Sequence, residues 1–583
     1  MERERLARLK RARGEVTDEV VSNASFDHTE AAAGVAADAT RIITPPSKRQ
    51  RISPPPPRPR GSGGSSQTQQ LDSAAVNGKA DGSTSAGLKV SRGKENESDL
   101  FWDGELRQVA NRLVDRDKDV WPTFRLSEII GPKSDITLAI LSSYSNAVDW
   151  LYDFFEPTTP IVLVNQPGED GNSGLKELAP NILMTKPFIR NGRGCMHIKI
   201  LLLFYKDGRL RICLPTANFV EYDWRDIENT AWVQDVPMRK TTIRHDPKAA
   251  DFPGTLQRVL HKLNVPAALT KLLDGNFPEL PIEALSELRM RWDWSKVKVK
   301  LVASLAGKYE GWDEVERTGH PALAKAIQEL GVTPPKGKEL VLECQGSSIG
   351  TYSRQWMDEI YCSAKGQSAK AWLNKPRSQR MKLAWPLIKI LFPSLATVKD
   401  SVLGMPGGGT MFCRKAQWES KNFPRELFHD SNSKRGRVLM HSKMIVGTFK
   451  DRVSPFVQGR SRGGRQVGKE RDDLTVREGG DYNAEAQMRP SSMSDGDGGE
   501  ERLAGWAYVG SHNFTPSAWG TVSGSVDKPS LNIVNYELGI VIPLRTGEEV
   551  ENVACWRRPA RKYVLDVDRP WMQEEMREGM AGI

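Results

Sequence analysis

The sequence predicts an α/β protein made of two similar halves, preceded by a disordered N-terminal tail. Three observations support this expectation. After residue 100, β-prone apolar runs alternate with segments of helical spacing; a short His-x-Lys motif occurs once in each half; and the first 98 residues are polar. Strands that alternate with helices are typical of sheets covered by helices on their faces. We therefore expect two α-β-α sandwich domains, at 99–294 and 295–583, with the functional site at their interface.

Residues 1–98 are rich in Ala, Gly, Ser, Pro and charged side chains and contain few aromatic ones. Such a segment cannot bury enough apolar surface to offset the entropy of ordering its chain. We expect it to be disordered, apart from a short helix over 2–13. A basic cluster at 47–51, followed by the Pro-rich segment 54–60, is of the kind that nuclear import receptors bind, although solvated linkers have similar clusters.

Apolar runs and their flanking turn residues predict the strands of both halves. The first half should contain strands at 136–141, 161–164, 198–204 and 210–214, with a helix at 146–155. The second half should contain strands at 297–303, 339–344, 443–447, 507–510 and 536–542. Between 449 and 501 the chain has almost no core-forming residues, which predicts a mobile insertion. The entropy cost of a loop grows slowly with its length, so the segments on either side can still meet.

The His-x-Lys motif of each half precedes an apolar run and is followed by an Asn in a turn. The two sets are His197, Lys199 and Asn218, and His441, Lys443 and Asn513. Alternate residues of a strand share a face, so each His would lie beside its Lys. Imidazole can act as nucleophile, acid or base near neutral pH, while ammonium and amide groups can hold phosphate oxygens. A single copy is more often a surface pair, but two copies with matching sequels predict phosphoryl transfer through two histidines.

Neither set contains the carboxylate cluster that would hold Mg²⁺ or Zn²⁺, so we expect no metal and no other cofactor. The net charge of +10 over 583 residues favours an anionic partner such as nucleic acid, with plain solubility as the alternative. The 6 Cys show no Cys-x-x-Cys spacing, which suits a reducing compartment. No segment has the length of a membrane span or the apolar core of a secretory signal, so we expect a soluble intracellular protein.

The two motifs resemble those of the phospholipase D superfamily, in which His-x-Lys is usually followed by an Asp. Here Phe204 and Thr448 occupy the two Asp positions. That departure is typical of the tyrosyl-DNA phosphodiesterase family, which uses Asn instead, and this chain looks like a fungal form of it. Further segments that match this family in order occur between about 100 and 572, at 148–151, 223–224, 345–350, 392–394, 510–519, 535–539 and 568–571. A match of this extent is far more specific than a short motif.

The resemblance implies two phospholipase D-like domains and hydrolysis of the 3′-phosphotyrosyl bond between DNA and a trapped topoisomerase I peptide. His197 would be the nucleophile that forms a covalent phosphohistidine, and His441 the general acid and base. The lysines and asparagines of the two motifs would hold the developing charge, and the product would be a 3′-phosphate. The partners would be DNA with 3′-tyrosyl or other blocked 3′ ends and the topoisomerase-derived peptide. The resemblance also implies a nuclear protein, which we expect to be a monomer.

The family's pattern also implies supporting residues. Asn229 and Glu537 would orient the two imidazoles, although Asn229 stands where the family more often has the longer Gln. Besides the two lysines, the residues expected to bind the substrate strand are Tyr144, Ser347, Ser348 and Thr515. Arg193 stands where an aromatic base-stacking residue is expected, and a guanidinium can also stack on bases.

Two other functions compete with DNA-end cleavage. A phospholipase-type lipid hydrolase would use the same fold, but the chain shows no amphipathic or lipid-anchoring segment. A non-catalytic nucleic-acid scaffold would carry the duplicated motif as a relic, yet every reacting group is present in both halves. The remaining histidines, including His512 beside Asn513, lack the motif and are expected to be structural.

Overall fold

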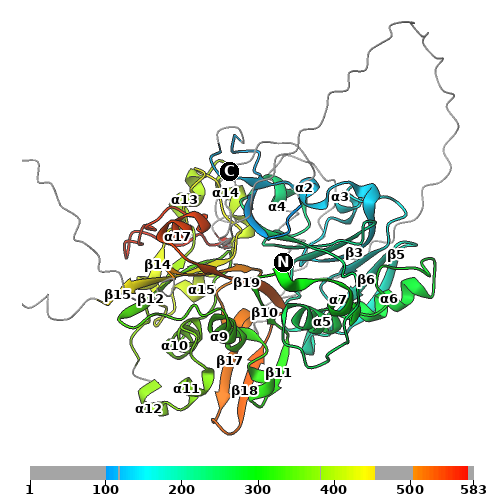
Figure 1. Ribbon diagram of the computed structural model, residues 1–583. Coiled ribbons are helices and arrows are strands. Elements are labelled where there is room, and N and C mark those ends of the chain that lie inside the picture. The colour runs from blue at the N-terminus through cyan, green and yellow to red at the C-terminus, as the bar shows by residue number, and fades with distance from the viewer. Residues whose placement is uncertain (1–99, 116–118, 381–382, 453–502, 575–583) are drawn as a thin grey trace, which may run out of the picture.

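The structure is a computed structural model that describes residues 100–115, 119–380, 383–452 and 503–574. The expected tail at 1–98, with its short helix, lies outside the described residues, as does most of the expected insertion. The described chain is a mixed α/β protein with two large sheets, each covered by helices on both faces (Figure 1). The predicted fold class is confirmed.

The first sheet has nine strands in the order β2-β1-β9-β8-β7-β3-β4-β6-β5. They are β1 (Glu105–Val109), β2 (Thr123–Phe124), β3 (Ile136–Ser142), β4 (Ile161–Val164), β5 (Gly174–Ala179), β6 (Ile182–Lys186), β7 (Ile200–Tyr205), β8 (Leu210–Pro215) and β9 (Thr230–Val236). Its helices are α2 (Leu126–Ile130), α3 (Val148–Tyr152), α4 (Glu221–Arg225), α5 (Phe252–Lys262), α6 (Val265–Leu273) and α7 (Glu287–Arg291).

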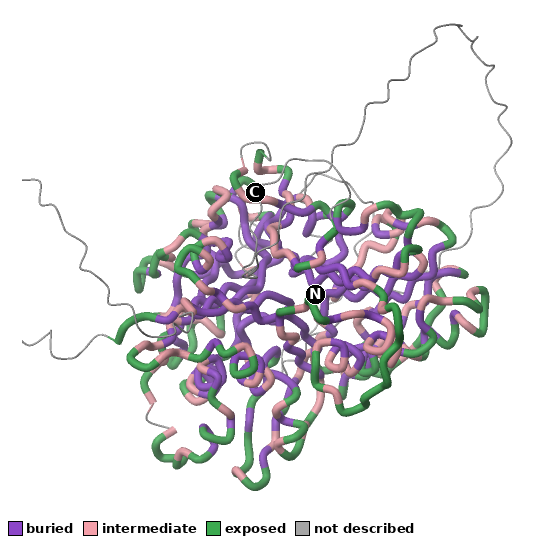
Figure 2. The backbone as a smooth tube through the Cα atoms, viewed as in Figure 1, coloured by how far each residue is buried: buried purple, intermediate pink, exposed green. Residues whose placement is uncertain are grey.

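Alternate residues of these strands enter different cores, as the two-residue period of a strand requires. In β3, Leu138 and Ile140 pack in the core that contains α5 and α6. Ala139 and Leu141 pack in the core that contains α2 and α3. Since both faces are covered, the central strands β3 and β7 are apolar along most of their length. Figure 2 shows the resulting buried layer running through the middle of the molecule.

The second sheet has seven strands in the order β10-β19-β16-β15-β12-β13-β14, and a three-stranded sheet has the order β11-β18-β17. The strands are β10 (Lys300–Ser304), β11 (Gly307–Glu310), β12 (Lys338–Gln345), β13 (Ile388–Leu391), β14 (Phe428–His429), β15 (Met444–Asp451), β16 (Gly505–Gly510), β17 (Thr521–Gly524), β18 (Pro529–Ile533) and β19 (Glu537–Leu544). The helices are α8 (Trp312–Val315), α9 (Gly319–Glu329), α10 (Arg354–Ala364), α11 (Ala369–Leu373), α12 (Arg377–Arg380), α13 (Leu395–Asp400), α14 (Gly404–Gly407), α15 (Lys415–Trp418), α16 (Pro516–Trp519) and α17 (Gly547–Val553).

This sheet also divides its side chains between two cores. Ile445 of β15 and Tyr508 of β16 belong to the core that contains α9 and α10. Their neighbours Val446 and Val509 belong to the core that contains α17. The core under α5 and α6 continues into the second half, because Ala303 of β10 and several residues of β19 are part of it. The two sheets are therefore joined through shared apolar packing.

Several predicted boundaries were wrong by a few residues. The strands expected from 198 and 443 begin at Ile200 and Met444, and the helix expected at 146–155 is limited to Val148–Tyr152. Residues 449–451, which were expected in the insertion, belong instead to β15, which pairs with β12 as far as Asp451. Phe449 is buried in the core, and Lys338 of the paired strand forms an ion pair of 2.8 Å with Asp451 at the end of β15. No helix within the described ranges is long and apolar enough to cross a membrane.

Candidate active site

Each histidine of the two motifs is attached by its backbone to the other half of the chain. His197 lies three residues before the start of β7, and its amide donates to the Tyr536 carbonyl at 2.9 Å. His441 lies three residues before the start of β15, and its amide donates to the Glu228 carbonyl at 2.7 Å. Isolated β-bridges, Met196 with Tyr536 and Glu228 with Met440, continue the same pairing. The site thus lies where the segments that precede β7 and β9 in the first half pair with the segments that precede β19 and β15 in the second half.

The two lysines occupy equivalent positions. Lys199 Nζ donates to the His197 carbonyl at 3.0 Å, and Lys443 Nζ donates to the His441 carbonyl at 2.5 Å. Lys443 Nζ also donates across the halves to the Thr216 carbonyl at 3.4 Å. Both lysines are almost fully buried. Their ammonium groups therefore place fixed positive charge in a poorly hydrated space, which is the environment in which it stabilises a phosphate most strongly.

Glu537, the first residue of β19, orients the His197 ring. His197 Nδ1 lies 2.8 Å from Glu537 Oε2 and 3.0 Å from the Ser511 carbonyl oxygen. Both neighbours of Nδ1 accept hydrogen bonds, so the proton is on Nδ1 and Nε2 keeps its lone pair. Ser511 Oγ donates to the same carboxylate at 2.6 Å, and Asn535 Nδ2 donates to its other oxygen at 3.1 Å. Glu537, the orienting partner expected for His197, is therefore in contact with it.

Opposing effects act on the pKa of His197. Burial lowers it below the ordinary value, and the charges of Lys199 and Lys443 act in the same direction, whereas Glu537 raises it. The net direction is downward, so the ring is neutral over a wider pH range than a free imidazole. Burial raises the pKa of Glu537, but the adjacent His197 and Lys199 bring it below its usual value, so the carboxyl stays ionised.

Asn229 occupies the position in the first half that Glu537 has in the second, but its side chain bonds elsewhere. Its Oδ1 accepts from Thr216 Oγ1 at 2.8 Å, and its Nδ2 donates to the Asp223 carbonyl at 2.8 Å. The group beside the second histidine is the carboxylate of Asp223, whose Oδ2 lies 3.3 Å from His441 Nδ1. Asn229 is one methylene shorter than the Gln that the family pattern favours. Asp223, rather than Asn229, therefore lies beside the His441 ring. Asn229 contributes indirectly, through its hydrogen bond to the backbone carbonyl of Asp223.

The two asparagines are buried and hydrogen-bonded to their own halves. The backbone and side-chain amides of Asn218 both donate to Asp223 Oδ2 at 2.8 Å. Asn513 Oδ1 accepts from the amides of Ser347 and Ser348 at 3.0 and 3.1 Å. Because its oxygen is occupied in this way, the Asn513 amide nitrogen remains oriented as a donor.

The residues expected to bind the substrate strand lie at different distances from the histidines. The Tyr144 ring meets the His197 ring edge to face, with centroids 5.7 Å apart. Ser347 and Ser348 reach the site through Asn513, as described above. Thr515 caps α16, its hydroxyl accepting from the Ala518 amide at 3.3 Å, so its side chain has a structural contact. Arg193 is exposed in the loop before His197.

His512 does not join the site. It is buried, its ring stacks on Trp519 with centroids 4.2 Å apart, and it contacts the hydroxyls of Tyr508 and Ser304. Burial lowers its pKa to about 3, so this imidazole stays neutral. Within the described residues, no group of three His, Cys, Asp or Glu side chains is arranged to hold a metal ion.

Comparison with known proteins agrees with this arrangement. The sequence model of the tyrosyl-DNA phosphodiesterase family matches residues 109–563 of the chain, a span that includes both His-x-Lys motifs and both cross-half bridges. The chain belongs to this family. The family resemblance suggested by the motifs is thereby confirmed.

Individual members of the tyrosyl-DNA phosphodiesterase family are distant relatives of this chain. Tyrosyl-DNA phosphodiesterase 1 of Arabidopsis thaliana is 25% identical over 342 residues, which cover 56% of this chain and 52% of the relative. Tyrosyl-DNA phosphodiesterase 1 of Drosophila melanogaster is 22% identical over 400 residues, which cover 67% and 57%. The chain thus spans little more than half the length of these two relatives. The crystal structure of yeast tyrosyl-DNA phosphodiesterase superposes with a TM-score of 0.51 at 16% identity, covering 80% of this chain and 100% of that one, which shows a shared fold.

Sequence reasoning missed the placement of Asp223. The dipeptide Asp223-Trp224 was recognised as a matching segment, but nothing in its spacing connects it to His441, which lies in the other half. A usable signal was present in Asn229. A side chain too short for its expected contact indicates that another group fills the position, and Asp223 is one of four carboxylates within six residues of Asn229, with Asp226, Glu228 and Asp235.

Proposed function

We propose that this protein hydrolyses the phosphodiester between the 3′ end of DNA and the tyrosine of a topoisomerase I-derived peptide. The observation that carries the proposal is the reciprocal attachment of two His-x-Lys motifs, each held by the backbone of the other half. Membership of the family supplies the reaction and the substrate. The buried lysines supply the anion-binding charge that a phosphodiester requires.

In the first step, His197 Nε2 attacks the phosphorus. A nitrogen–phosphorus bond forms and the bond to the tyrosine oxygen breaks, while His441 donates a proton to the departing phenolate. The Nδ1 proton of His197 stays on the ring and is stabilised by ionised Glu537 as the ring becomes positive. Lys199, Lys443 and the amides of Asn218 and Asn513 hold the charge on the phosphoryl oxygens.

In the second step, a water molecule is deprotonated by His441 and attacks the same phosphorus. The oxygen–phosphorus bond forms, the nitrogen–phosphorus bond breaks, and neutral His197 is released with a 3′-phosphate end on the DNA. His441 then carries the proton with which it began. Because one histidine serves as acid and then as base, it needs an orienting partner in both protonation states, and Asp223 is the group placed to provide it.

The test is cleavage of a single-stranded oligonucleotide with a 3′-phosphotyrosine, in the presence of EDTA. We expect release of tyrosine and a 3′-phosphate, and no turnover by His197→Ala. The His441→Asn variant should accumulate a covalent protein–DNA adduct attached at His197. Full activity of His197→Ala would refute the assignment of the nucleophile.

The two competing functions give different results in the same experiment. Release of phosphatidic acid from vesicles without action on DNA would favour a lipid hydrolase. DNA binding without turnover of any phosphodiester would favour a scaffold. We further propose that the protein acts in the nucleus as a monomer, which fluorescence microscopy of the tagged chain and light scattering of the purified one would test.

A further inference from the structure

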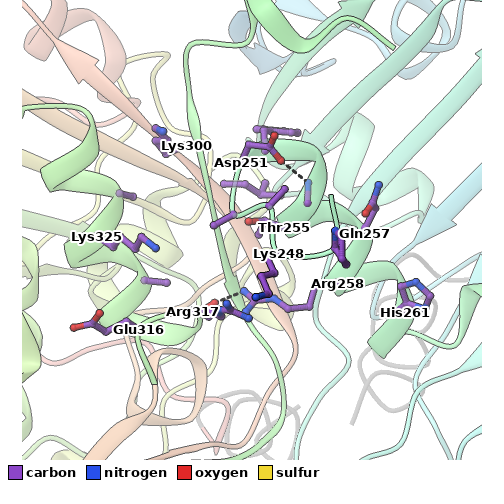
Figure 3. A pocket seen from close by; sticks show the side chains of 18 of the residues that line it. Lys248, Asp251, Thr255, Gln257, Arg258, His261, Lys300, Glu316, Arg317 and Lys325 are labelled. Carbon is purple, nitrogen blue, oxygen red and sulfur yellow. Dashed lines mark hydrogen bonds between the residues drawn. The ribbon is translucent and has the colours of Figure 1, made fainter. Parts of the chain in front are cut away.

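A cavity of about 440 Å³ lies between the two halves, and none of the residues of the candidate active site lines it. The first half contributes α5 and the residues before it, from His245 to Asp251. The second half contributes β10, α9 and the end of the segment before α9 (Figure 3). We call it the seam cavity. Its volume lies in the range of small-molecule sites, roughly 300 to 1,000 Å³.

Positive charge predominates in the lining of the seam cavity. Its cationic side chains are Lys248, Arg258, Lys262, Lys300, Arg317 and Lys325. Only three acidic side chains line it, those of Asp251, Glu316 and Glu329. The cavity therefore has an excess of cations before any ligand binds.

The three acids are already engaged. Glu329 pairs with Lys300 at 2.8 Å and with Lys325 at 3.9 Å. Asp251 caps α5 by accepting from the Gly254 amide at 3.0 Å, and it also accepts from Arg289 at 2.9 Å. Glu316 accepts from Ser368 Oγ at 3.1 Å. None of these contacts neutralises Lys248, Arg258 or Arg317.

Arg258 and Arg317 lie close together and are weakly compensated. The Arg258 guanidinium donates to the Arg317 carbonyl oxygen, whereas its Nε has no hydrogen-bond partner in the described part of the chain. Burial, and next the positive charge of Arg317, lower the pKa of Arg258. A guanidinium does not lose its proton near neutral pH, so this arrangement is unfavourable unless an anion lies nearby. Among the described residues, Arg317 forms an ion pair with the exposed carboxylate of Glu314 at 3.7 Å, which compensates it weakly.

We propose that the seam cavity binds a small phosphate-bearing molecule through Arg258, Arg317 and Lys248. The planar guanidinium matches the geometry of phosphate oxygens and gives two hydrogen bonds at once, while lysine adds a point charge. Figure 3 shows the three side chains directed into the same space, from three separate segments. Since Lys248 and Arg258 belong to the first half and Arg317 to the second, the bound molecule connects the two halves at a place separate from the histidines.

The probe is inorganic pyrophosphate, titrated into the full chain by calorimetry at constant ionic strength. We expect the Arg258→Gln variant to bind about tenfold more weakly, because a charge-assisted contact is lost. Lys248→Gln should weaken binding in the same direction. This residue is exposed, so its substitution leaves folding intact and keeps the test valid if Arg258→Gln does not fold. The matched control is Lys308→Gln, an exposed lysine paired with Glu310 outside the cavity, which should bind as the unaltered protein does.

Pyrophosphate can also occupy the histidine site, so a second readout separates the two. Inhibition of phosphodiester cleavage by pyrophosphate reports the histidine site and should be the same in Arg258→Gln, Lys248→Gln and the unaltered chain. Equal calorimetric affinity in the cavity variants and in Lys308→Gln would overturn the proposal. Displacement of cavity-bound pyrophosphate by an unmodified oligonucleotide would also overturn it, since the cavity would then be part of a DNA path. Both outcomes are independent of whether the chain cleaves tyrosyl-DNA.

Discussion

Replacing Glu537 by Gln tests how the carboxylate acts on the nucleophile. In the unaltered protein, His197 Nδ1 lies 2.8 Å from a carboxylate oxygen of Glu537. The Gln side chain keeps an oxygen that can accept this hydrogen bond but has no negative charge. A charge-assisted hydrogen bond contributes about 1.5 to 3 kcal/mol and a neutral one about 0.5 to 1.5 kcal/mol. The loss of about 1 to 1.5 kcal/mol falls on the step in which the ring becomes positive. We therefore expect adduct formation to slow about five- to tenfold at pH 7.5.

The same variant should also change the pH dependence. Glu537 is the group that raises the pKa of His197 against burial and the two lysines, so its neutralisation lowers that pKa further. Attack requires the neutral ring, and the acid limb of the rate profile should consequently move to lower pH. The assay is rapid-quench measurement of the protein–DNA adduct from pH 4.5 to 8.5, with Glu426→Gln, an exposed carboxyl, as control. An unchanged rate together with an unmoved acid limb would refute the role of Glu537.

Three further predictions follow from the same contacts. Asp223→Asn removes the charge that lies 3.3 Å from His441 Nδ1. We expect it to slow breakdown of the adduct about fivefold or more, and to slow adduct formation less. Rapid-quench kinetics equal to those of Asp400→Asn, a control at an exposed site, would contradict this. Burial raises the pKa of Glu228 to about 7, so the folded state binds this proton more tightly than the unfolded chain, and stability from this group is lost as pH rises from about 4.5 through 7. Urea unfolding at pH 5 and 8 should show that Glu228→Gln removes on the order of 3 kcal/mol of this pH dependence, and parallel curves for both proteins would disprove it. Gly194→Ala places a Cβ 2.1 Å from the Val534 carbonyl oxygen at a φ of +135°, so it should displace the segment that leads to His197; normal cleavage and an unchanged Tm would argue against that steric effect.

The sequence predicted most of the long apolar strands but missed β9, in which buried polar groups interrupt the apolar pattern. The run at 161–164 is a strand over the predicted residues, because its four side chains are apolar and all buried. Strand β9 was not predicted, since Gln234 and Asp235 interrupt its apolar pattern. Both are nevertheless buried, and Asp235 is compensated by Arg209 and Arg211 from the neighbouring loop and strand. Such compensation depends on strands that are paired only after folding, so no local pattern reveals it.

In the candidate site, too, some residues could be predicted from the sequence and others could not. The reacting side chains His197, Lys199, His441 and Lys443 could be selected because they repeat, and repetition is visible in a sequence. Their surroundings could not be derived, because each imidazole is positioned by atoms of the opposite half. The expected partner Asn229 was selected from its position in the family pattern. The contact beside His441 depends instead on the turn that brings Asp223 back toward Asn218.

The reciprocal bridges Met196–Tyr536 and Glu228–Met440 constrain how such a protein can change over time. After duplication of a self-contained ancestor, each copy would ordinarily be free to drift or to be lost. Here neither copy retains a complete set of supports for its own imidazole, so the loss of one removes the scaffold of the other. Neither half can therefore position its own imidazole without the other, even though the side chains beside the two rings, Glu537 and Asp223, differ.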